Sequence, residues 1–154
     1  MHPTILAVDD EPDVLDLIRF HLTRAGCEVV TAASGYTALE AIRARRPDLV
    51  LLDLMLPDID GFAVCEILRR QAATAAIPIV IVSAWSTNDS RNLGLELGAL
   101  DYVTKPFSPR VLVERVLGLG VACGAANALS SKTGFFRTED VDAVLPRVHV
   151  VRLE

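Results

Sequence analysis

Short apolar runs alternate with longer amphipathic stretches along most of this sequence, and the alternation restricts the folds available to it. The apolar runs read as β-strands because they are short, contain many β-branched residues and end at turn residues. They occupy Thr4–Val8, Cys27–Ala32, Leu49–Leu54, Ile77–Ala84 and Asp101–Lys105. Strands separated by helical stretches form βαβ units, and the strands of such units are parallel.

The intervening stretches have the periodicity of amphipathic helices. These helices are expected at about residues 12–25, 36–46, 62–71, 88–98 and 109–119. One face of the first helix carries Val14, Leu15, Leu17, Ile18 and Leu22. The last helix should begin with Ser108 as its N-cap and Pro109 in the first helical position.

The middle strands are apolar almost throughout, which indicates a sheet covered on both faces. The sequence therefore predicts an α/β fold: a doubly wound, five-stranded parallel sheet of flavodoxin-like order 2-1-3-4-5, with helices on both faces. We expect this domain to occupy residues 1–128. The alternation then stops, and residues 129–154 form a tail too short for a further domain. The tail contains a short helical pattern at Thr138–Leu145 and a strand-like "VHVVRL" segment.

Composition excludes several classes of function. Of the 154 residues, 51% are hydrophobic and 23% are charged, as in globular proteins with a sizeable core. The net charge of −5 offers no basic surface for nucleic acid, so we expect no direct nucleic-acid binding. The N-terminal region is acidic where a signal peptide would be basic, and no apolar run is long enough to span a membrane. These features predict a cytoplasmic protein without membrane association.

Polar side chains follow four of the predicted strands. Asp9 and Asp10 follow the first strand, Asp53 lies near the end of the third, and the fourth and fifth end near Ser83 and Lys105. The carboxyl ends of parallel strands share one edge of the sheet, where α/β proteins bind their ligands. We therefore expect these five side chains to meet in one cleft.

Three carboxylates in one cleft repel each other unless a cation joins them. The three cysteines and three histidines are scattered, so a metal would have to rely on oxygen ligands, and Mg²⁺ suits such a site. A lysine and a hydroxyl beside it can bind phosphoryl oxygens, and one aspartate could act as the nucleophile. Taken singly, each residue also has an ordinary interpretation, as a helix cap, a turn residue or a solvated lysine. The shared edge favours the joint interpretation.

Four segments, "VDDEP", "LVLLDLMLPDIDGF", "PIVIVSA" and "GALDYVTKPF", occur in this order, each at a strand end. Over about residues 3–120 the chain resembles the receiver domain of two-component response regulators. The resemblance implies that Asp53 accepts a phosphoryl group from a histidine kinase or phosphotransfer protein. It also implies that Asp10 and Asp53 bind Mg²⁺ directly, Asp9 binds it through water, and the Met55 backbone carbonyl is a further ligand.

The resemblance implies roles for three more residues. Lys105 would pair with the phosphoryl oxygens, and the Lys105–Pro106 peptide bond is expected to be cis. Ser83 would reorient toward the phosphoryl group, and Tyr102 would follow it inward. The face made by the fourth helix, fifth strand and fifth helix would then change and control binding of a downstream effector or a second copy. Such a protein is not an enzyme, beyond catalysing its own phosphorylation and dephosphorylation.

Met55 and Trp85 lie two residues beyond Asp53 and Ser83, where their side chains could flank the phosphoryl group. Our hypothesis is that both exclude water and slow hydrolysis of the acyl phosphate. An equally simple interpretation of Trp85 is a partly exposed loop aromatic.

Three other functions remain open. An aspartate-nucleophile phosphatase of the haloacid-dehalogenase type would need a second acid where Met55 stands, and a cap domain. A flavodoxin-like nucleotide-binding module would need a Gly/Ser/Thr-rich phosphate loop where "VDDEP" stands. A receiver-like interaction module that works without phosphorylation is disfavoured by the complete set of site residues but not excluded by it.

Overall fold

The computed structural model describes residues 2–120, which form five strands and five helices in strict alternation. The strands are β1 (Thr4–Val8), β2 (Glu28–Ala32), β3 (Leu49–Leu52), β4 (Ile79–Ser83) and β5 (Asp101–Thr104). The helices are α1 (Pro12–Arg24), α2 (Gly35–Ala44), α3 (Gly61–Arg70), α4 (Asn88–Glu96) and α5 (Pro109–Gly118). The predicted domain boundary at residue 128 and the tail patterns fall outside the described residues.

All strand pairs are parallel, and the sheet has the order β2-β1-β3-β4-β5. The predicted fold class and strand order are therefore confirmed. From β1 the chain continues to β2 on one side of it and then returns to β3 on its other side. The carboxyl ends of the neighbouring strands β1 and β3 therefore form the topological switch point of the sheet. In the register of this pair, Val8 lies opposite Leu52. The residues that follow these two strands are brought together by that register.

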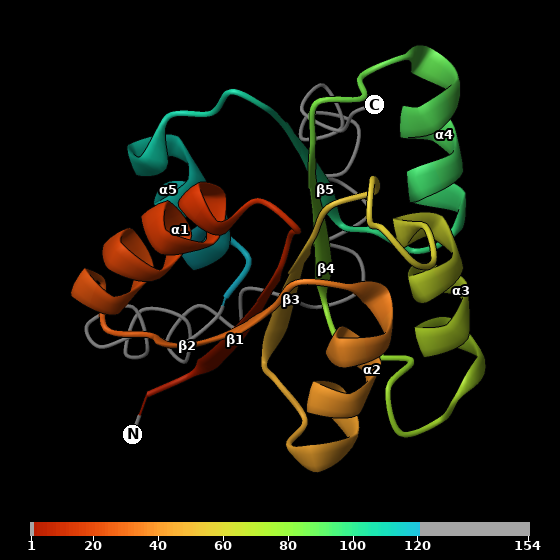
Figure 1. The fold of residues 1–154 in the computed structure, drawn as a ribbon, viewed down its shortest axis with the longest axis horizontal. Helices are drawn as coiled ribbons and strands as arrows, with labels where there is room; N and C mark the ends of the chain where they lie inside the picture. Colours follow the sequence, from red (N-terminus) through yellow and green to blue (C-terminus); the bar gives the residue numbers. More distant parts are fainter. Residues whose placement is uncertain (1, 121–154) are drawn as a thin grey trace.

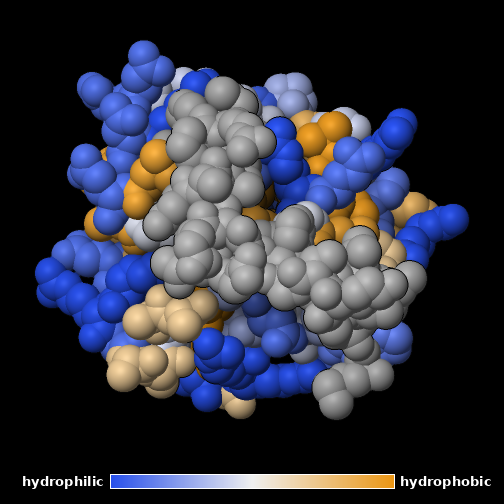
Figure 2. Space-filling model, turned by 180° about the vertical axis from the view of Figure 1, so that it is seen from behind, coloured by the Kyte–Doolittle hydropathy of each residue, from blue (hydrophilic) through white to orange (hydrophobic). Residues whose placement is uncertain are grey.

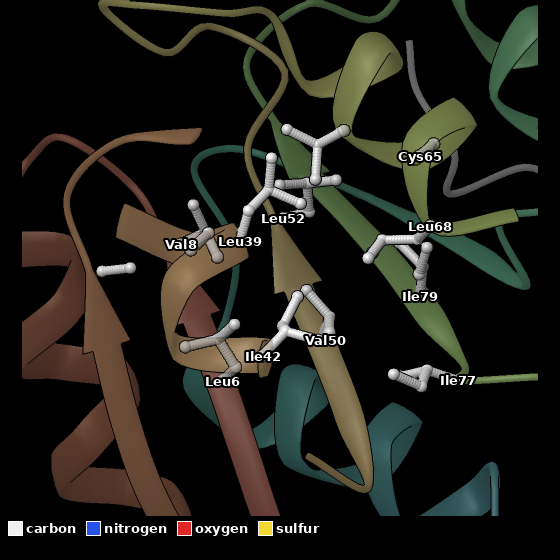
Figure 3. Packing of buried hydrophobic residues seen from close by; sticks show 13 residues of the cluster. Leu6, Val8, Leu39, Ile42, Val50, Leu52, Cys65, Leu68, Ile77 and Ile79 are labelled. Atoms are coloured by element: carbon white, nitrogen blue, oxygen red, sulfur yellow. The ribbon is translucent and has the colours of Figure 1, made fainter. Parts of the chain in front are cut away.

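Helices cover both faces of the sheet: α1 and α5 lie on one side, and α2, α3 and α4 on the other (Figure 1). Successive residues of β3 point to opposite sides, and both sides are buried. Leu49 and Leu51 pack with side chains of α1 and α5, whereas Val50 and Leu52 pack with α2 and α3. Figure 3 shows the second of these clusters, in which Leu39 and Ile42 of α2 and Leu68 of α3 face the strands.

Two details differ from the sequence-based expectation. Leu17 lies on the predicted buried face of α1 but is 38% exposed, and Ile18 and Leu22 are the residues of this helix that are buried. Ser108 is the N-cap of α5, and Pro109 begins the helix as expected. Within residues 2–120, however, the Ser108 side chain makes no capping hydrogen bond.

On the face shown in Figure 2, the described residues that are visible are mostly hydrophilic, with small hydrophobic groups between them. Among residues 2–120, no helix is both long and apolar enough to cross a membrane.

Candidate functional site

Asp9, Asp10 and Asp53 meet at the switch point, as predicted. Each offers a carboxylate oxygen, and these oxygens all lie within 4.8 Å of one another. Backbone pairing past the strand ends holds two of them in place, because the Asp53 N–H donates to the Val8 carbonyl at 3.0 Å and the Asp9 N–H to the Ala32 carbonyl at 3.1 Å. Asp9 and Asp53 are buried, whereas Asp10 is exposed.

Lys105 follows β5 and reaches across the sheet edge into this acidic cluster. Its Nζ lies 2.6 Å from Asp9 Oδ2 and 3.0 Å from Asp53 Oδ2, and its side chain is only 12% exposed. The Lys105 backbone continues the strand pairing by donating its N–H to the Ser83 carbonyl at 2.9 Å. The Lys105–Pro106 peptide bond is cis, as expected.

Two buried carboxylates are each held by both oxygens. In Asp9, Oδ1 accepts the Glu11 backbone N–H at 2.9 Å while Oδ2 contacts Lys105. In Asp53, Oδ1 accepts the Met55 backbone N–H at 3.1 Å while Oδ2 contacts Lys105. A carboxylate fixed at both oxygens has a defined orientation, which favours chemistry that depends on positioning.

The electrostatics of the site follow from burial and from these contacts. Burial raises the pKa of Asp9 above its ordinary value, and the nearby charge of Asp53 adds to this effect, although the Lys105 hydrogen bond opposes it. For Lys105, burial lowers the pKa, but the hydrogen bonds to Asp9 and Asp53 outweigh it and the pKa is raised. The lysine therefore stays protonated across the physiological range.

Above the carboxylates lies an open cleft of about 880 Å³. It is lined by Asp10, Glu11, Asp53, Leu54, Met55, Leu56, Pro57, Asp60, Ala84, Trp85 and Lys105. Met55 and Trp85 are 60% and 46% exposed, as expected for side chains at the mouth of a cleft. The Trp85 ring also contacts the Phe62 ring, with 5.9 Å between the centroids.

Ser83 and Tyr102 lie behind the cleft lining, and both contact the backbone of Trp85. The Ser83 hydroxyl accepts the Trp85 N–H at 3.2 Å, and the Tyr102 hydroxyl donates to the Trp85 carbonyl. Both side chains are completely buried. Tyr102 therefore already occupies an inward position, and the predicted inward movement would have to start from there.

Sequence reasoning missed two acidic residues of this region, Glu11 and Asp60. Glu11 contacts Lys105 Nζ at 3.2 Å and lines the cleft, and its place directly after Asp10 could have revealed it. Asp60 also lines the cleft, and it caps α3 by accepting the Ala63 N–H at 2.9 Å. An aspartate just before an apolar helical pattern is an N-cap signal that sequence reasoning could have used.

The donor set suits a hard divalent cation. Three carboxylates converge without a histidine or cysteine among them, and one of the three is exposed beside an open cleft. Oxygen ligands with room for water are what Mg²⁺ requires. The residues present therefore fit Mg²⁺, with Asp9, Asp10 and Asp53 as its candidate carboxylate ligands.

A family model described as the response regulator receiver domain matches residues 5–117. The chain belongs to this family. Among curated relatives of this receiver domain, the alkaline phosphatase synthesis transcriptional regulatory protein PhoP of Bacillus subtilis (strain 168) is 46% identical over 116 residues, covering 75% of this chain and 48% of PhoP. The DNA-binding response regulator MtrA of Mycolicibacterium smegmatis is also 46% identical over 116 residues, covering 75% of this chain and 50% of MtrA.

Solved structures agree with this membership. A putative response regulator from Chloroflexus aurantiacus J-10-fl is 40% identical, with a TM-score of 0.72, covering 75% of this chain and 95% of that one. The BeF3-activated N-terminal receiver domain of Klebsiella pneumoniae RstA is 40% identical, with a TM-score of 0.68, covering 73% of this chain and 94% of that one.

This receiver domain spans about half the length of the curated relatives it matches. MtrA is named as a DNA-binding regulator. The expectation that the protein does not bind nucleic acid directly therefore has no support from its relatives. The expectation rested on the acidic net charge, which describes this chain and not the other half of such regulators.

Proposed function

We propose that Asp53 is the phosphoacceptor of a two-component signalling pathway. The observation that carries this proposal is the position of Lys105, whose Nζ contacts Asp53 Oδ2 at 3.0 Å beside an open cleft. A carboxylate oxygen of Asp53 would attack the phosphorus of a phosphohistidine, and the imidazole would leave as the phosphorus–nitrogen bond breaks. Lys105 would then exchange a carboxylate partner for a phosphoryl oxygen.

Asp9, Asp10 and Asp53, together with the Met55 backbone carbonyl, would hold Mg²⁺. When bound, Mg²⁺ would neutralise negative charge on the phosphoryl oxygens. Glu11 and Lys105 contact each other and line the same cleft. The protein's own contribution is to hold Asp53 with one oxygen on the Met55 N–H and the other beside Lys105, so that little reorganisation is needed.

The change on phosphorylation would pass through the Trp85 backbone. Phosphorylation adds about −1.5 to −2 charge. Movement of the Ser83 hydroxyl toward this charge would disturb its hydrogen bond with the Trp85 N–H, and the Trp85 carbonyl is the partner of Tyr102. A shift of this segment would alter the face made by α4, β5 and α5, and a downstream effector or a second copy would bind one state better than the other.

The partners we propose are a histidine kinase or phosphotransfer protein upstream and an effector or second copy downstream, in the cytoplasm. Names of the relatives suggest transcriptional output, which would require the part of those proteins that this chain does not match. The domain would act as a signalling switch and not as an enzyme on other substrates.

The test is the intact mass of the protein after incubation with Mg²⁺ and acetyl phosphate. We expect a gain of one phosphoryl group that hydroxylamine removes. Asp53→Asn should abolish the gain. Asp60→Asn is the matched control, because it neutralises a carboxylate of the same cleft and asparagine caps a helix as well as aspartate does.

The incubation is then repeated with a histidine kinase as the phosphoryl donor, in case the domain does not react with small donors such as acetyl phosphate. If neither donor modifies the wild-type protein, the phosphoacceptor proposal is wrong. The observation would then favour an interaction module that works without phosphorylation. Release of inorganic phosphate from small phosphate esters, lost in Asp53→Asn, would instead favour a phosphatase.

A further inference from the structure

The loop between β3 and α3, residues 53–60, is bound at its middle to the first turn of α2. Oδ1 of Asp58 accepts the Gly35 backbone N–H at 2.9 Å, and Oδ2 accepts the Tyr36 backbone N–H at 2.9 Å. The same carboxylate also accepts the N–H of Ile59 at 2.8 Å. Asp58 therefore connects residues that are more than 20 positions apart in the chain.

The first N–H groups of a helix have no partner within the helix and attract negative charge. The effect is visible in the acidity of Asp58. Desolvation raises the pKa of this carboxyl, but the backbone N–H groups of Tyr36, Gly35 and Ile59 outweigh it and lower the pKa to about 2. The carboxylate is thus ionised and bound at any physiological pH.

Helix α2 also has a cap of its own, which pairs other N–H groups than those bound by Asp58. The Ser34 hydroxyl accepts the Thr37 N–H at 3.2 Å, and the Thr37 hydroxyl accepts the Ser34 N–H at 3.1 Å. These two residues form a capping box at the start of the helix. Asp58 is therefore an additional contact from a distant loop, and it joins that loop to the first turn of α2.

The loop has little freedom elsewhere. A Cβ atom on Gly35 would lie 2.3 Å from Ile59 Cγ1, so the loop packs directly on the α2 backbone. At the other end, a Cβ atom on Gly61 would lie 2.5 Å from the Asp53 carbonyl oxygen. Between these two contacts lies Met55, whose N–H holds Asp53 Oδ1 at 3.1 Å.

We propose that Asp58 is a positioning residue of the phosphoacceptor site. By holding the loop on α2, it keeps the Met55 N–H on Asp53 and presents the Met55 carbonyl as a metal ligand. The metal-binding part of this inference rests on the proposed function. Binding at the cleft and order at the start of α2 are then coupled, and the coupling is reciprocal. Mg²⁺ should therefore slow hydrogen exchange at the Gly35 and Tyr36 amides.

The test compares Asp58→Ala with Asp48→Ala. Asp48 is the matched control because it is also exposed, its carboxylate accepts the Thr4 backbone N–H at 2.7 Å, and it lies before β3 at the opposite end of that strand. Each variant removes one negative charge and one carboxylate that accepts hydrogen bonds from backbone N–H groups. Asp58→Asn keeps a single acceptor oxygen and should fall between wild type and Asp58→Ala.

Two measurements are made. The first is Mg²⁺ affinity from the fluorescence of Trp85, which is the only tryptophan and lines the cleft. We expect Asp58→Ala to weaken binding about tenfold, as for other residues that orient metal ligands, and Asp48→Ala to leave it unchanged. The second is the amide resonance of Met55 in metal-free protein, which should shift in Asp58→Ala and stay in place in Asp48→Ala.

An unchanged Mg²⁺ affinity together with an unmoved Met55 resonance in folded Asp58→Ala or Asp58→Asn would overturn the inference. Equal weakening in Asp58→Ala and Asp48→Ala would also overturn it, because the cause would then be charge or general destabilisation. If wild type itself gives no response to Mg²⁺, the proposed metal site is wrong, and the Met55 resonance alone decides whether Asp58 positions the loop.

Discussion

Replacing Gly61 by alanine should disturb both the stability of the domain and its phosphoacceptor. Gly61 is the first residue of α3, and its N–H donates to the Leu54 carbonyl at 2.9 Å. A Cβ atom there would lie 2.5 Å from the Asp53 carbonyl oxygen and 2.7 Å from Leu54 Cα, whereas ordinary contacts begin at 3.4 Å. Both neighbours are backbone atoms, so the clash can be relieved only by moving the chain that carries Asp53.

The expected magnitude follows from two opposing effects. Overpacking of this kind costs about 1–3 kcal/mol. Alanine in place of glycine in a helix gains up to about 1 kcal/mol. The net cost lies between about 0 and 3 kcal/mol, and from the middle of that range we expect Gly61→Ala to lower the free energy of unfolding by about 1–2 kcal/mol. Urea denaturation measures this directly, provided that the slope of the transition is unchanged.

Two other helical glycines provide the comparison. Outside Gly118, its two chain neighbours and the adjacent backbone of its own helix, no described atom lies within 4 Å of the position that a Cβ atom on Gly118 would occupy, so Gly118→Ala should stabilise the domain by about 0.5–1 kcal/mol. A Cβ atom on Gly94 would have as its nearest neighbour, at 2.8 Å, Cδ1 of Ile81, which is the far end of a flexible side chain. Gly94→Ala should therefore be close to neutral.

The functional readout is the initial rate of phosphorylation by acetyl phosphate, under conditions in which all three variants are folded. Gly61→Ala should be slower than wild type by at least about tenfold, because displacement of reacting groups by about 1 Å can reduce rates by about a hundredfold. Gly118→Ala should react at the wild-type rate. Equal stabilities of Gly61→Ala and Gly118→Ala would refute the steric reasoning.

Three further predictions follow from the contacts of the site. The pKa of Asp58 is about 2 in the folded protein against an ordinary 3.8, so its stabilising contribution is present above pH 3.8 and is lost as the pH falls toward 2. The difference in urea midpoint between wild type and Asp58→Asn should therefore shrink over that pH range, and a constant difference would contradict this. Burial raises the pKa of Asp9 above its ordinary value, so burial makes the ionised carboxylate less stable in the folded protein than in water. Asp9→Asn should therefore raise the free energy of unfolding in EDTA while weakening Mg²⁺ binding, and a lower melting temperature in EDTA would count against it. Replacing Met55 and Trp85 together by serine should shorten the lifetime of the phosphorylated protein, followed by mass, and an unchanged lifetime would rule out water exclusion by these side chains.

The strands and helices could be predicted from the sequence because local patterns decide them. The alternation of apolar and amphipathic segments located every element to within a few residues, and β1 matched in full. The parallel direction of the strands followed from the helical connections, and the order 2-1-3-4-5 was expected as a common order of doubly wound sheets. The convergence of Asp9, Asp10, Asp53 and Lys105 also followed, because the carboxyl ends of parallel strands share one edge.

The contacts around those residues depended on the tertiary structure. No local pattern shows that Asp58 reaches an α2 turn more than 20 residues away, or that Lys105 bridges Asp9 and Asp53. Ser83 was expected in the cleft and Tyr102 was expected to follow it inward, and the sequence did not show that both side chains contact the Trp85 backbone. Which way a side chain at a strand end points depends on loop conformation and packing from distant elements. Sequence by itself therefore determined which residues share the edge of the sheet, whereas only tertiary packing decided which atoms meet there.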